Sequence, residues 1–355
     1  MAFFSGGAPQ IATSATNSAE KDVEISDPPS DSISSIAFSP QADYLGVASW
    51  DNSVRIYEIG PQGQSQGKAM YQHPGPVLDV CWNADGTKLF SGGADNAARM
   101  FDTTTGQSTQ VAQHEASVKC VAWVNTPQAG ILATGSWDKT VKYWDLRTQA
   151  PVATVQLPER CYALDVQYPW LVVGTAERHI KVFDLNNPTV PFKDLMSPLK
   201  WQTRTLSCFS LPSGGGYAVG SVEGRVAIHF IDDKNSQGNF SFRCHRRDSV
   251  PNSKDQSLIY AVNAMAYHPV QGTLATAGSD GTMHFWDTEA RTRLKSFDPT
   301  VAPVTSVAFN RTGDLFAYAA SYDWSKGHSS MVPGTPNKLM LHKCRDEEVR
   351  KRLKK

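Results

Sequence analysis

The chain has 355 residues, with 34 basic and 34 acidic side chains, so its formal net charge at pH 7 is zero. This balance excludes global cationic attraction as a reason to expect nucleic-acid binding, and any basic site must be local. Hydrophobic residues make up 40% and charged residues 19%, which allows a substantial core and is too apolar for general disorder. No run of 18 apolar residues and no secretory signal occurs, which predicts an intracellular protein without membrane insertion.

The first segment with a structural pattern begins after residue 20. Residues 1–20 are rich in Ser, Ala, Gly and Thr without any periodicity, and we expect them to be mobile. The segment KDVEI at 21–25 then alternates polar and apolar residues as a β-strand does. Its partner depends on the fold of the rest of the chain.

From residue 47 the chain repeats a unit that contains an acidic turn residue. In the clearest copies a second acidic residue stands seven positions after the first. The five clear copies are VASWDNSVRIYE (47–58), SGGADNAARMFD (91–102), TGSWDKTVKYWD (134–145), GTAERHIKVFD (174–184) and AGSDGTMHFWD (277–287). Two weaker copies are GSVEGRVAIHF (220–230) and AASYDWSKGH (319–328). The turn acids lie 39 to 57 residues apart, at Asp51, Asp95, Asp138, Glu177, Glu223, Asp280 and Asp323.

Another alternating strand precedes each turn, and helical periodicity is nearly absent. A period near 40 to 45 residues ending in Trp-Asp is typical of WD-repeat propellers, in which each unit forms one four-stranded blade. The sequence therefore predicts an all-β, seven-bladed WD-repeat β-propeller over residues 21–342. Because an open ring would leave strand edges unpaired, we expect KDVEI to close it as the outer strand of the seventh blade, beside KLMLH at 338–342.

The third unit predicts a structural hydrogen-bond network. Asp138 in the turn can accept from His114 of the preceding loop, while Ser136 or Thr134 links it toward Trp144. Ser, His and Asp also form hydrolytic triads, but the turn acid recurs in every unit, which favours a structural role. No nucleophile elbow, phosphate-binding loop or zinc motif occurs, so we expect no catalytic residue, no cofactor and no metal site.

Two segments depart from the repeat and are candidates for partner binding. The run at 242–247, FRCHRR, has three bases in six residues, and we expect a disordered loop behind it at 248–257. In the seventh unit Trp324 follows the turn acid, where other units carry Asn, Lys, Arg or Gly, and it has no evident role in the core. Partner binding is favoured for it, and local loop packing is the alternative. Loops between blades and turns after second strands emerge on one side of a propeller. The residues expected to flank one groove there are Arg246, Arg247, Trp324 and Lys326.

The C-terminal segment 343–355 is a basic tail, KCRDEEVRKRLKK, with seven bases and three acids. It could form a short helix after the ring closes. A solvated tail is favoured over an RNA contact, because a charge run alone seldom identifies its partner.

Several less regular segments carry a more specific resemblance. They are KDVEISDPPSDSISSIAFSP at the start, CYALDVQYPWLVVGTAERHIKVFDL in the fourth unit, EGRVAIHF with FRCHR in the fifth, YAVNAMAYHPVQGTLATAGSDG in the sixth and FAYAASYDWSKGH in the seventh. Together they resemble the nuclear-pore-associated messenger RNA export factor family over about residues 21–350. The resemblance implies a monomeric propeller in a heterocomplex, which binds a GLEBS-type peptide of a phenylalanine-glycine nucleoporin and supports messenger RNA export. It also implies a location in the nucleus, at the nuclear pore complex and nuclear envelope, with shuttling to the cytoplasm.

Two other interpretations stay open at this point. The mitotic spindle checkpoint propellers, which bind GLEBS-like segments of checkpoint kinases, share the EGRVA and FRCHR stretches, although the insertion beginning DWSKGH is more similar to the export factors. The third interpretation is direct binding of RNA or messenger ribonucleoprotein, which a steep loss of affinity with salt would indicate.

Overall fold

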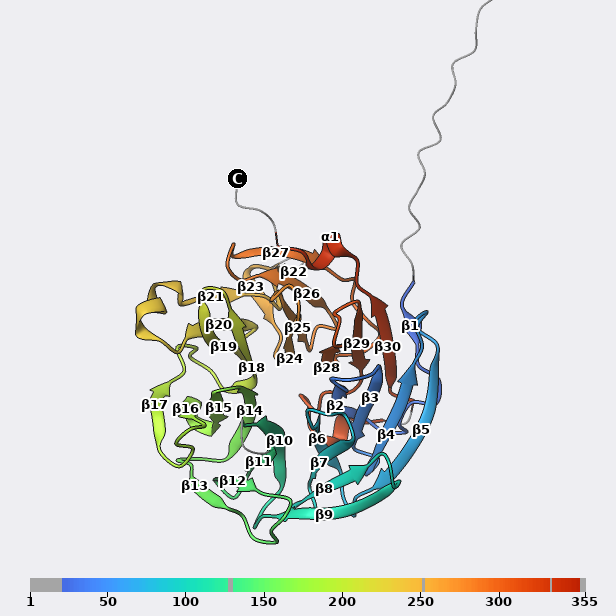
Figure 1. The fold of residues 1–355 in the computed structure, drawn as a ribbon. Helices are drawn as coiled ribbons and strands as arrows, with labels where there is room; N and C mark the ends of the chain where they lie inside the picture. The colour runs from blue at the N-terminus through green and yellow to red at the C-terminus, as the bar shows by residue number, and fades with distance from the viewer. Residues whose placement is uncertain (1–20, 127–129, 251–252, 333, 352–355) are drawn as a thin grey trace, which may run out of the picture.

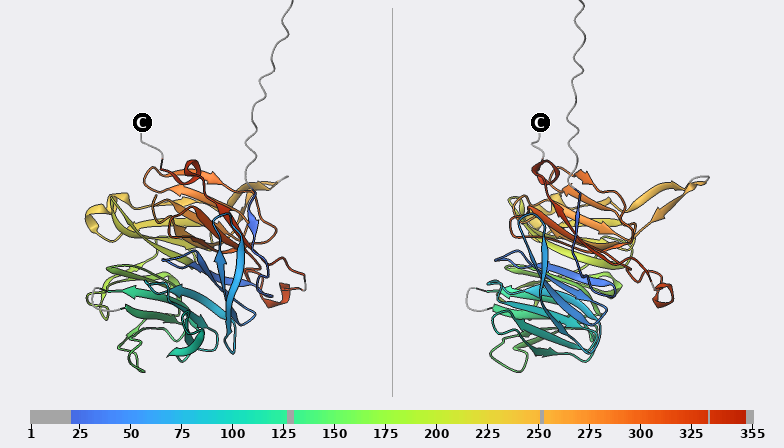
Figure 2. Two further views of the ribbon diagram at one scale, coloured as in Figure 1. Left: turned by 45° about the vertical axis from the view of Figure 1, so that its right-hand side comes forward. Right: turned by 90° about the vertical axis from the view of Figure 1, so that its right-hand side faces the viewer.

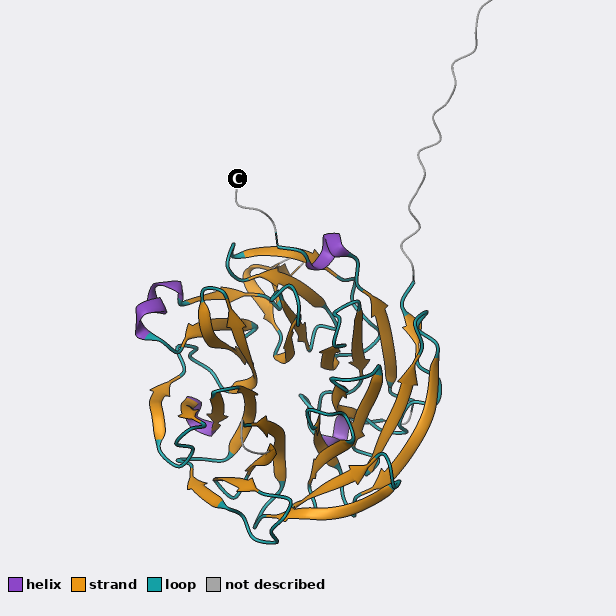
Figure 3. Ribbon diagram, in the orientation of Figure 1, coloured by secondary structure: helices purple, strands orange, loops and turns teal. Residues whose placement is uncertain are grey.

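The structure, a computed structural model, describes residues 21–126, 130–250, 253–332 and 334–351; residues 1–20, expected to be mobile, lie outside these ranges. Within them the chain forms seven four-stranded antiparallel sheets around a central axis, and one two-stranded hairpin (Figure 1). The helical turns of this part of the chain sit between strands or at the rim (Figure 3): η1 (Ala176–Arg178), η2 (Asp233–Gly238), η3 (His328–Ser330) and α1 (Asp346–Val349). The predicted seven-bladed β-propeller is confirmed.

Each of the first six blades uses four strands that follow one another in the chain. Blade 1 contains β2 (Ile33–Phe38), β3 (Tyr44–Ser49), β4 (Ser53–Ile59) and β5 (Ser65–Gln72). Blade 2 contains β6 (Val77–Trp82), β7 (Lys88–Gly93), β8 (Ala97–Asp102) and β9 (Gln107–Gln113). Blade 3 contains β10 (Val118–Asn125), β11 (Gly130–Ser136), β12 (Thr140–Trp144) and β13 (Ala153–Gln156).

The second half of the ring adds a hairpin between two blades. Blade 4 contains β14 (Cys161–Gln167), β15 (Trp170–Thr175), β16 (His179–Asp184) and β17 (Pro191–Met196). Blade 5 contains β18 (Thr203–Leu211), β19 (Gly214–Ser221), β20 (Arg225–Phe230) and β21 (Phe240–Arg243), and the hairpin β22 (Arg246–Val250) and β23 (Ser253–Ile259) follows it. Blade 6 contains β24 (Val262–Tyr267), β25 (Leu274–Gly278), β26 (Met283–Asp287) and β27 (Thr292–Ser296). Blade 7 contains β28 (Val304–Phe309), β29 (Leu315–Ala320), β30 (Lys338–Lys343) and, from the other end of the chain, β1 (Val23–Glu24).

The second strand of each blade is the most buried, because neighbouring sheets cover it on both faces. All residues of β29, with the sequence LFAYAA, are buried, and β3 is buried beyond its first residue. The outermost strands, such as β9, remain largely exposed. Small residues in the second strands allow the blades to approach closely: a Cβ on Gly92 would lie 2.8 Å from Val118 of the next blade. The small-residue pattern of the repeat is therefore a packing requirement.

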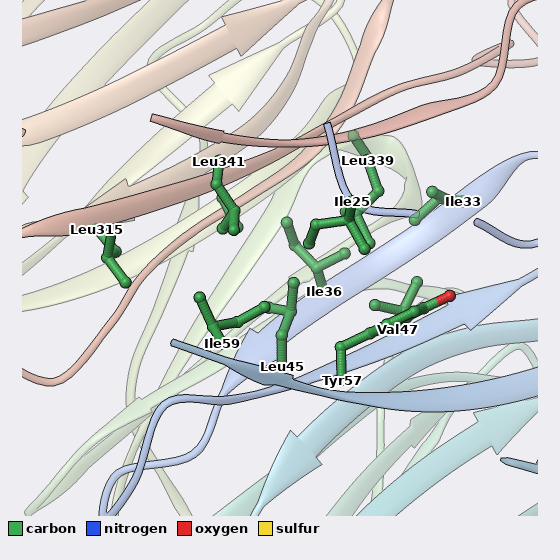
Figure 4. Packing of buried hydrophobic residues seen from close by; sticks show 12 residues of the cluster. Ile25, Ile33, Ile36, Leu45, Val47, Tyr57, Ile59, Leu315, Leu339 and Leu341 are labelled. Atoms are coloured by element: carbon green, nitrogen blue, oxygen red, sulfur yellow. The ribbon is translucent and has the colours of Figure 1, made fainter. Parts of the chain in front are cut away.

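The N-terminal strand closes the ring as the sequence predicted. In the antiparallel pair of β1 and β30, Val23 lies opposite Leu341, and the backbone N–H of Ile25 donates to the carbonyl of Leu339 at 2.8 Å. The side chain of Ile25 is fully buried and packs with apolar residues of blades 7 and 1, Leu339 and Ile36 among them (Figure 4). The strand therefore satisfies an open edge and also fills the core between the first and last blades.

A buried ionic cluster, here called the closure clasp, joins the two ends of the chain and consists of Asp22, Tyr318, His342 and Glu348. The imidazole of His342 lies between two carboxylates, with Nδ1 2.7 Å from Oδ1 of Asp22 and Nε2 3.0 Å from Oε2 of Glu348. The hydroxyl of Tyr318 donates to the other oxygen of Asp22 at 2.7 Å. Burial alone would lower the pKa of His342, but hydrogen bonds and attraction from both carboxylates outweigh it and raise this pKa to about 9.

The closure clasp should make stability depend on pH. Because the folded state raises the pKa of His342 above its ordinary value of 6.5, the clasp stabilises the fold fully below about pH 6.5 and loses this contribution as pH rises through 9. We expect His342→Gln to lower the free energy of unfolding at pH 6.5 by about 1 to 3 kcal/mol, and by much less at pH 10. Urea unfolding of both proteins across this range measures the difference, and a constant difference would contradict a charged His342.

The C-terminal segment up to residue 351 is not a solvated tail, so this interpretation is wrong for the described residues. Helix α1 packs against blade 6, and Val349, 3% exposed, joins the cluster of buried aromatic residues around Phe285 and Phe316. The ammonium of Lys351 lies 2.6 Å from a carboxylate oxygen of Glu289. The many charged residues of this segment gave no indication that Val349 would be buried. Its burial holds α1 against the ring.

Candidate partner-binding face

In the third blade a chain of hydrogen bonds joins the turn acid to the tryptophan of the repeat. The imidazole of His114 has Nδ1 2.8 Å from Oδ2 of Asp138 and Nε2 2.7 Å from Oγ1 of Thr134, while the indole of Trp144 donates to the same threonine oxygen at 2.8 Å. Burial lowers the pKa of His114, which favours the neutral ring. With its proton on Nδ1 the neutral ring donates to Asp138 and accepts from Thr134. Each side-chain polar group in this series of hydrogen bonds therefore has a partner.

Ser136 does not link the turn to Trp144, an alternative that the sequence left open beside Thr134. Its hydroxyl donates to the carbonyl of Ala116 at 3.0 Å and accepts from the backbone N–H of Asp138 at 3.0 Å. Ser136 thus holds the turn in shape, and Thr134 provides the link.

The full arrangement recurs in blade 6, and blade 2 repeats it without the tryptophan, since Phe101 takes that position. In blade 6 the indole of Trp286 donates to Oγ1 of Thr276 at 3.0 Å. The ring of His245 lies 3.2 Å from the same threonine oxygen and 3.0 Å from Oδ1 of Asp280. In blade 2 His73 lies 3.1 Å from Asp95 and 2.7 Å from Ser91. Repetition is expected of a device that satisfies polar groups between packed sheets, whereas a catalytic triad would be needed once.

The Asp138→Ala substitution tests this structural role. We expect the free energy of unfolding to fall by roughly 1 to 3 kcal/mol, because His114 loses its acceptor while buried. Chemical denaturation measures this change, and Asp138→Asn, which keeps an acceptor oxygen, should cost less. Partner affinity should fall only as far as folding does, so an unchanged stability would contradict the proposed network.

Trp324 occupies an unfavourable backbone position. The residue directly after the turn acid has a positive φ in every blade, between 59° and 72°, at Asn52, Asn96, Lys139, Arg178, Gly224, Gly281 and Trp324. Gly and Asn adopt this conformation readily, whereas a bulky side chain there costs on the order of 1–3 kcal/mol. The indole Nε1 of Trp324 is also buried and has no hydrogen-bond partner among the described residues. The stability of the turn therefore does not explain this tryptophan.

Trp324 nevertheless has a defined orientation. Its ring stacks on Trp50 of the first blade, with the centroids 4.2 Å apart, and lies against Tyr322 at 5.5 Å. The preceding Asp323 accepts from the side chains of Ser279 and Asn263 in blade 6, and its carbonyl accepts from Arg204 of blade 5 at 3.0 Å. The sequence left both partner binding and local loop packing open for Trp324; the structure gives it an aromatic neighbour and leaves it half-buried.

The described residues of the loop expected at 248–257 lie in two paired strands, with a register irregularity between Asp248 and Val250, so this prediction is wrong for them. Strands β22 and β23 pair with Arg246 opposite Ile259 and Arg247 opposite Leu258. These two strands form a separate sheet outside the blades. Because they are held by backbone hydrogen bonds and not by burial of one face, their sequence does not need to alternate polar and apolar residues. Its strands carry exposed apolar side chains, since Leu258 and Ile259 are 42% and 48% exposed.

The two arginines at the base of the hairpin differ in availability. The Nε of Arg246 donates to the carbonyl of Glu223 at 2.8 Å, and its guanidinium lies 3.6 Å from the carboxylate of Glu223. Its side chain is 15% exposed. Arg247 is exposed, and so is Lys326 of the seventh blade. Arg246 thus ties the hairpin to the turn of blade 5, while Arg247 and Lys326 present their charges to solvent.

The hairpin β22–β23 and the insertion around η3 project beyond the same face of the ring (Figure 2, right). This follows from the antiparallel order of the strands, which places connections between blades and turns after second strands on one side. We call this side the insertion face. Exposed apolar residues that the sequence analysis missed also lie in such connections, at Trp137, Trp201 and Val222, and Trp201 is 63% exposed. The available signal was an apolar residue directly before the turn acid at Trp137 and Val222, and one between two repeats at Trp201.

Blade 6 carries a second feature that the sequence analysis missed, a cluster of aromatic and arginine side chains at its junction with blade 5. Phe242 lies 4.7 Å from the ring of Trp286, the guanidinium of Arg291 lies 4.6 Å from the ring centroid of Phe240, and that of Arg293 lies 5.9 Å from Trp286. Both arginines are exposed. We call these residues the aromatic–arginine cluster.

In the described ranges no group of three or more His, Cys, Asp or Glu side chains is arranged to hold a metal ion. Over the same ranges no helix has the length and apolar character needed to cross a membrane.

The fold and its repeated His–Asp turns define a WD-repeat propeller, and the family of the WD domain, G-beta repeat, matches residues 24–58, 64–102, 106–145 and 255–287. The Poly(A)+ RNA export protein of Schizosaccharomyces pombe is 54% identical over 356 aligned residues, covering 100% of this chain and 99% of the relative. The mRNA export factor GLE2 of Chaetomium thermophilum is 46% identical, covering 99% and 98%. Protein Rae1 of Drosophila melanogaster is 45% identical, covering 95% and 97%. The chain belongs to the family of WD-repeat messenger RNA export factors.

Proposed function

We propose that this protein is a noncatalytic adaptor that supports messenger RNA export by binding a GLEBS-type peptide of a phenylalanine-glycine nucleoporin at the nuclear pore. The observation that carries the proposal is the identity of 54% along the whole chain to a relative named as a Poly(A)+ RNA export protein. A location at the pore and the nuclear envelope accompanies this role.

The insertion face is the proposed docking site for the peptide. Trp324, half-buried and strained, serves as the apolar anchor, because binding energy concentrates on large aromatic side chains. Arg247 and Lys326 attract acidic side chains of the peptide to this face. Arg246 supports the site by binding Glu223, which holds the hairpin in place. Its side chain is partly exposed and can also contact the peptide.

Calorimetry with the purified full chain and an acidic GLEBS-type peptide tests this proposal. A peptide of the same composition in scrambled order is the control, because general charge attraction would bind both alike. Binding of the ordered peptide alone supports the adaptor role. Absence of binding, or equal binding of both peptides, rejects it.

The aromatic–arginine cluster supports direct RNA contact as a second candidate function. Exposed guanidinium groups held over aromatic rings offer stacking surfaces for bases and charges for phosphates. We expect single-stranded RNA to bind with an affinity that falls steeply with salt, and Arg291→Ala with Arg293→Ala to reduce the slope of log K against log salt by about 1 to 2. Arg160→Ala, at an arginine that also lies over an aromatic ring but in blade 4, is the matched control. Nearly flat salt dependence would contradict this function.

A further inference from the structure

The end of the insertion between β29 and β30, together with the first residue of β30, forms a sequence that the repeat does not require, Thr335-Pro336-Asn337-Lys338. A threonine or serine followed by proline, with a base three positions after the hydroxyl residue, is the substrate pattern of proline-directed protein kinases of the cyclin-dependent type. The chain has one other copy of this pattern, Ser197-Pro198-Leu199-Lys200. Pattern alone does not separate the two sites, but their surroundings do.

Ser197 is protected by the fold. It is 5% exposed, its hydroxyl accepts from the backbone N–H of Leu199, and its own N–H donates to the carbonyl of Arg178 at 2.8 Å. A kinase would have to open the connection between blades 4 and 5 to reach this hydroxyl.

Thr335 lies at the surface of the insertion. It is half-buried between exposed Gly334 and Pro336, and its hydroxyl donates to the carbonyl of the exposed Val332 at 2.7 Å. The ideal Cβ position of Gly334 meets no atom within 4 Å, so the space beside the threonine is open. Freeing this hydroxyl disrupts one local turn and no packed strand.

We propose that Thr335 is a phosphorylation site for a proline-directed kinase, and that the phosphate weakens binding of the acidic peptide to the insertion face. In the modification the Thr335 oxygen forms a bond to the γ-phosphorus of ATP, the bond from that phosphorus to ADP breaks, and the hydroxyl proton passes to the base of the kinase. The second half of the proposal rests on the function proposed above.

The expected effect follows from charge. Phosphorylation adds close to two negative charges to the segment that also carries Lys326 and Trp324. Lys338, three residues further on, already pairs with Glu24 at 2.8 Å, whereas Lys326 of the same insertion is exposed. The phosphate would therefore offset the positive charge that this insertion presents to solvent. An acidic peptide then loses attraction and meets repulsion on the same face.

The modification is tested with the full chain, a cyclin-dependent kinase with its cyclin, ATP and site mapping by mass spectrometry. We expect phosphate on Thr335 and none on Ser197 in the folded protein, and phosphate on both sites once the chain is heat-denatured. Thr335→Ala should abolish the modification of the folded chain, and Pro336→Ala, which keeps the hydroxyl, should strongly reduce it. An unmodified Thr335, or equal modification of Ser197 in the folded protein, overturns the assignment.

The effect on binding is measured by titrating the acidic peptide into phosphorylated and phosphatase-treated protein. We expect affinity about five- to tenfold lower with the phosphate, fully restored by the phosphatase. Equal affinities overturn the regulatory part of the proposal. If the unmodified chain fails to bind the peptide, the adaptor function and its regulation are rejected together, while the mapping experiment still decides whether Thr335 is a kinase site.

Discussion

Replacing Trp324 by Asn is expected to weaken binding of an acidic GLEBS-type peptide about thirtyfold, equivalent to about 2 kcal/mol, while the ring stays folded. Asn is the natural residue at the same turn position in blades 1 and 2, where Asn52 and Asn96 have φ of 69° and 65°. The substitution removes the aromatic anchor and relieves the backbone strain, but it also loses the stack on Trp50. These two effects on stability oppose each other, so the Tm should change by no more than about 2 °C.

Calorimetry and thermal unfolding of the same preparations separate binding from folding. Trp137→Ala is the matched control, because Trp137 is a 37% exposed aromatic in the corresponding turn of blade 3. It also lies on the insertion face, but in a different blade from the hairpin and the seventh-blade residues to which the peptide is proposed to bind. This variant should keep wild-type affinity. Lys326→Glu should chiefly slow association, as expected for a charge at the rim of an interface. Wild-type affinity of a folded Trp324→Asn protein would place the peptide elsewhere on the propeller.

Removing residues 1–30 is expected to destabilise the ring by on the order of 5 kcal/mol, whereas removing residues 1–20 should leave stability nearly unchanged. The longer deletion exposes the edge of β30, removes the fully buried Ile25 and takes Asp22 away from His342. Burial of one isoleucine contributes about 1.5 to 3 kcal/mol, and each hydrogen bond about 0.5 to 1.5 kcal/mol. The shorter deletion keeps every contact of the described residues.

Thermal and urea unfolding of the two truncated proteins test this closure, and the Tm of the longer deletion should fall by more than about 5 °C. The point variant Ile25→Asp in the full chain provides an independent measurement, because it places a charge in the core between blades 1 and 7 without shortening the chain. Equal melting temperatures for the two truncations would mean that β1 contributes little to closure.

The blades, their number and their closure could be predicted from the sequence because the signals are local and repeated. The turn acids recur at intervals of 39 to 57 residues, and the strands before them alternate polar and apolar residues. Asp138 is only 24 residues from His114, its hydrogen-bond partner. The segment KDVEI was assigned to the last blade because a propeller leaves one edge that must be paired. Each of these inferences depends on repetition or on a general requirement of sheets.

Contacts between distant segments were decided only by the tertiary structure. Trp50 and Trp324 belong to the first and last repeats, and they stack because ring closure brings the two ends of the chain together. The hairpin at 246–259 pairs through backbone groups, which carry no side-chain pattern, and the C-terminal segment docks through Val349 in spite of its many charges. Local periodicity thus determined the architecture of this protein. Its candidate binding surface depends on non-local packing, which a one-dimensional pattern does not encode.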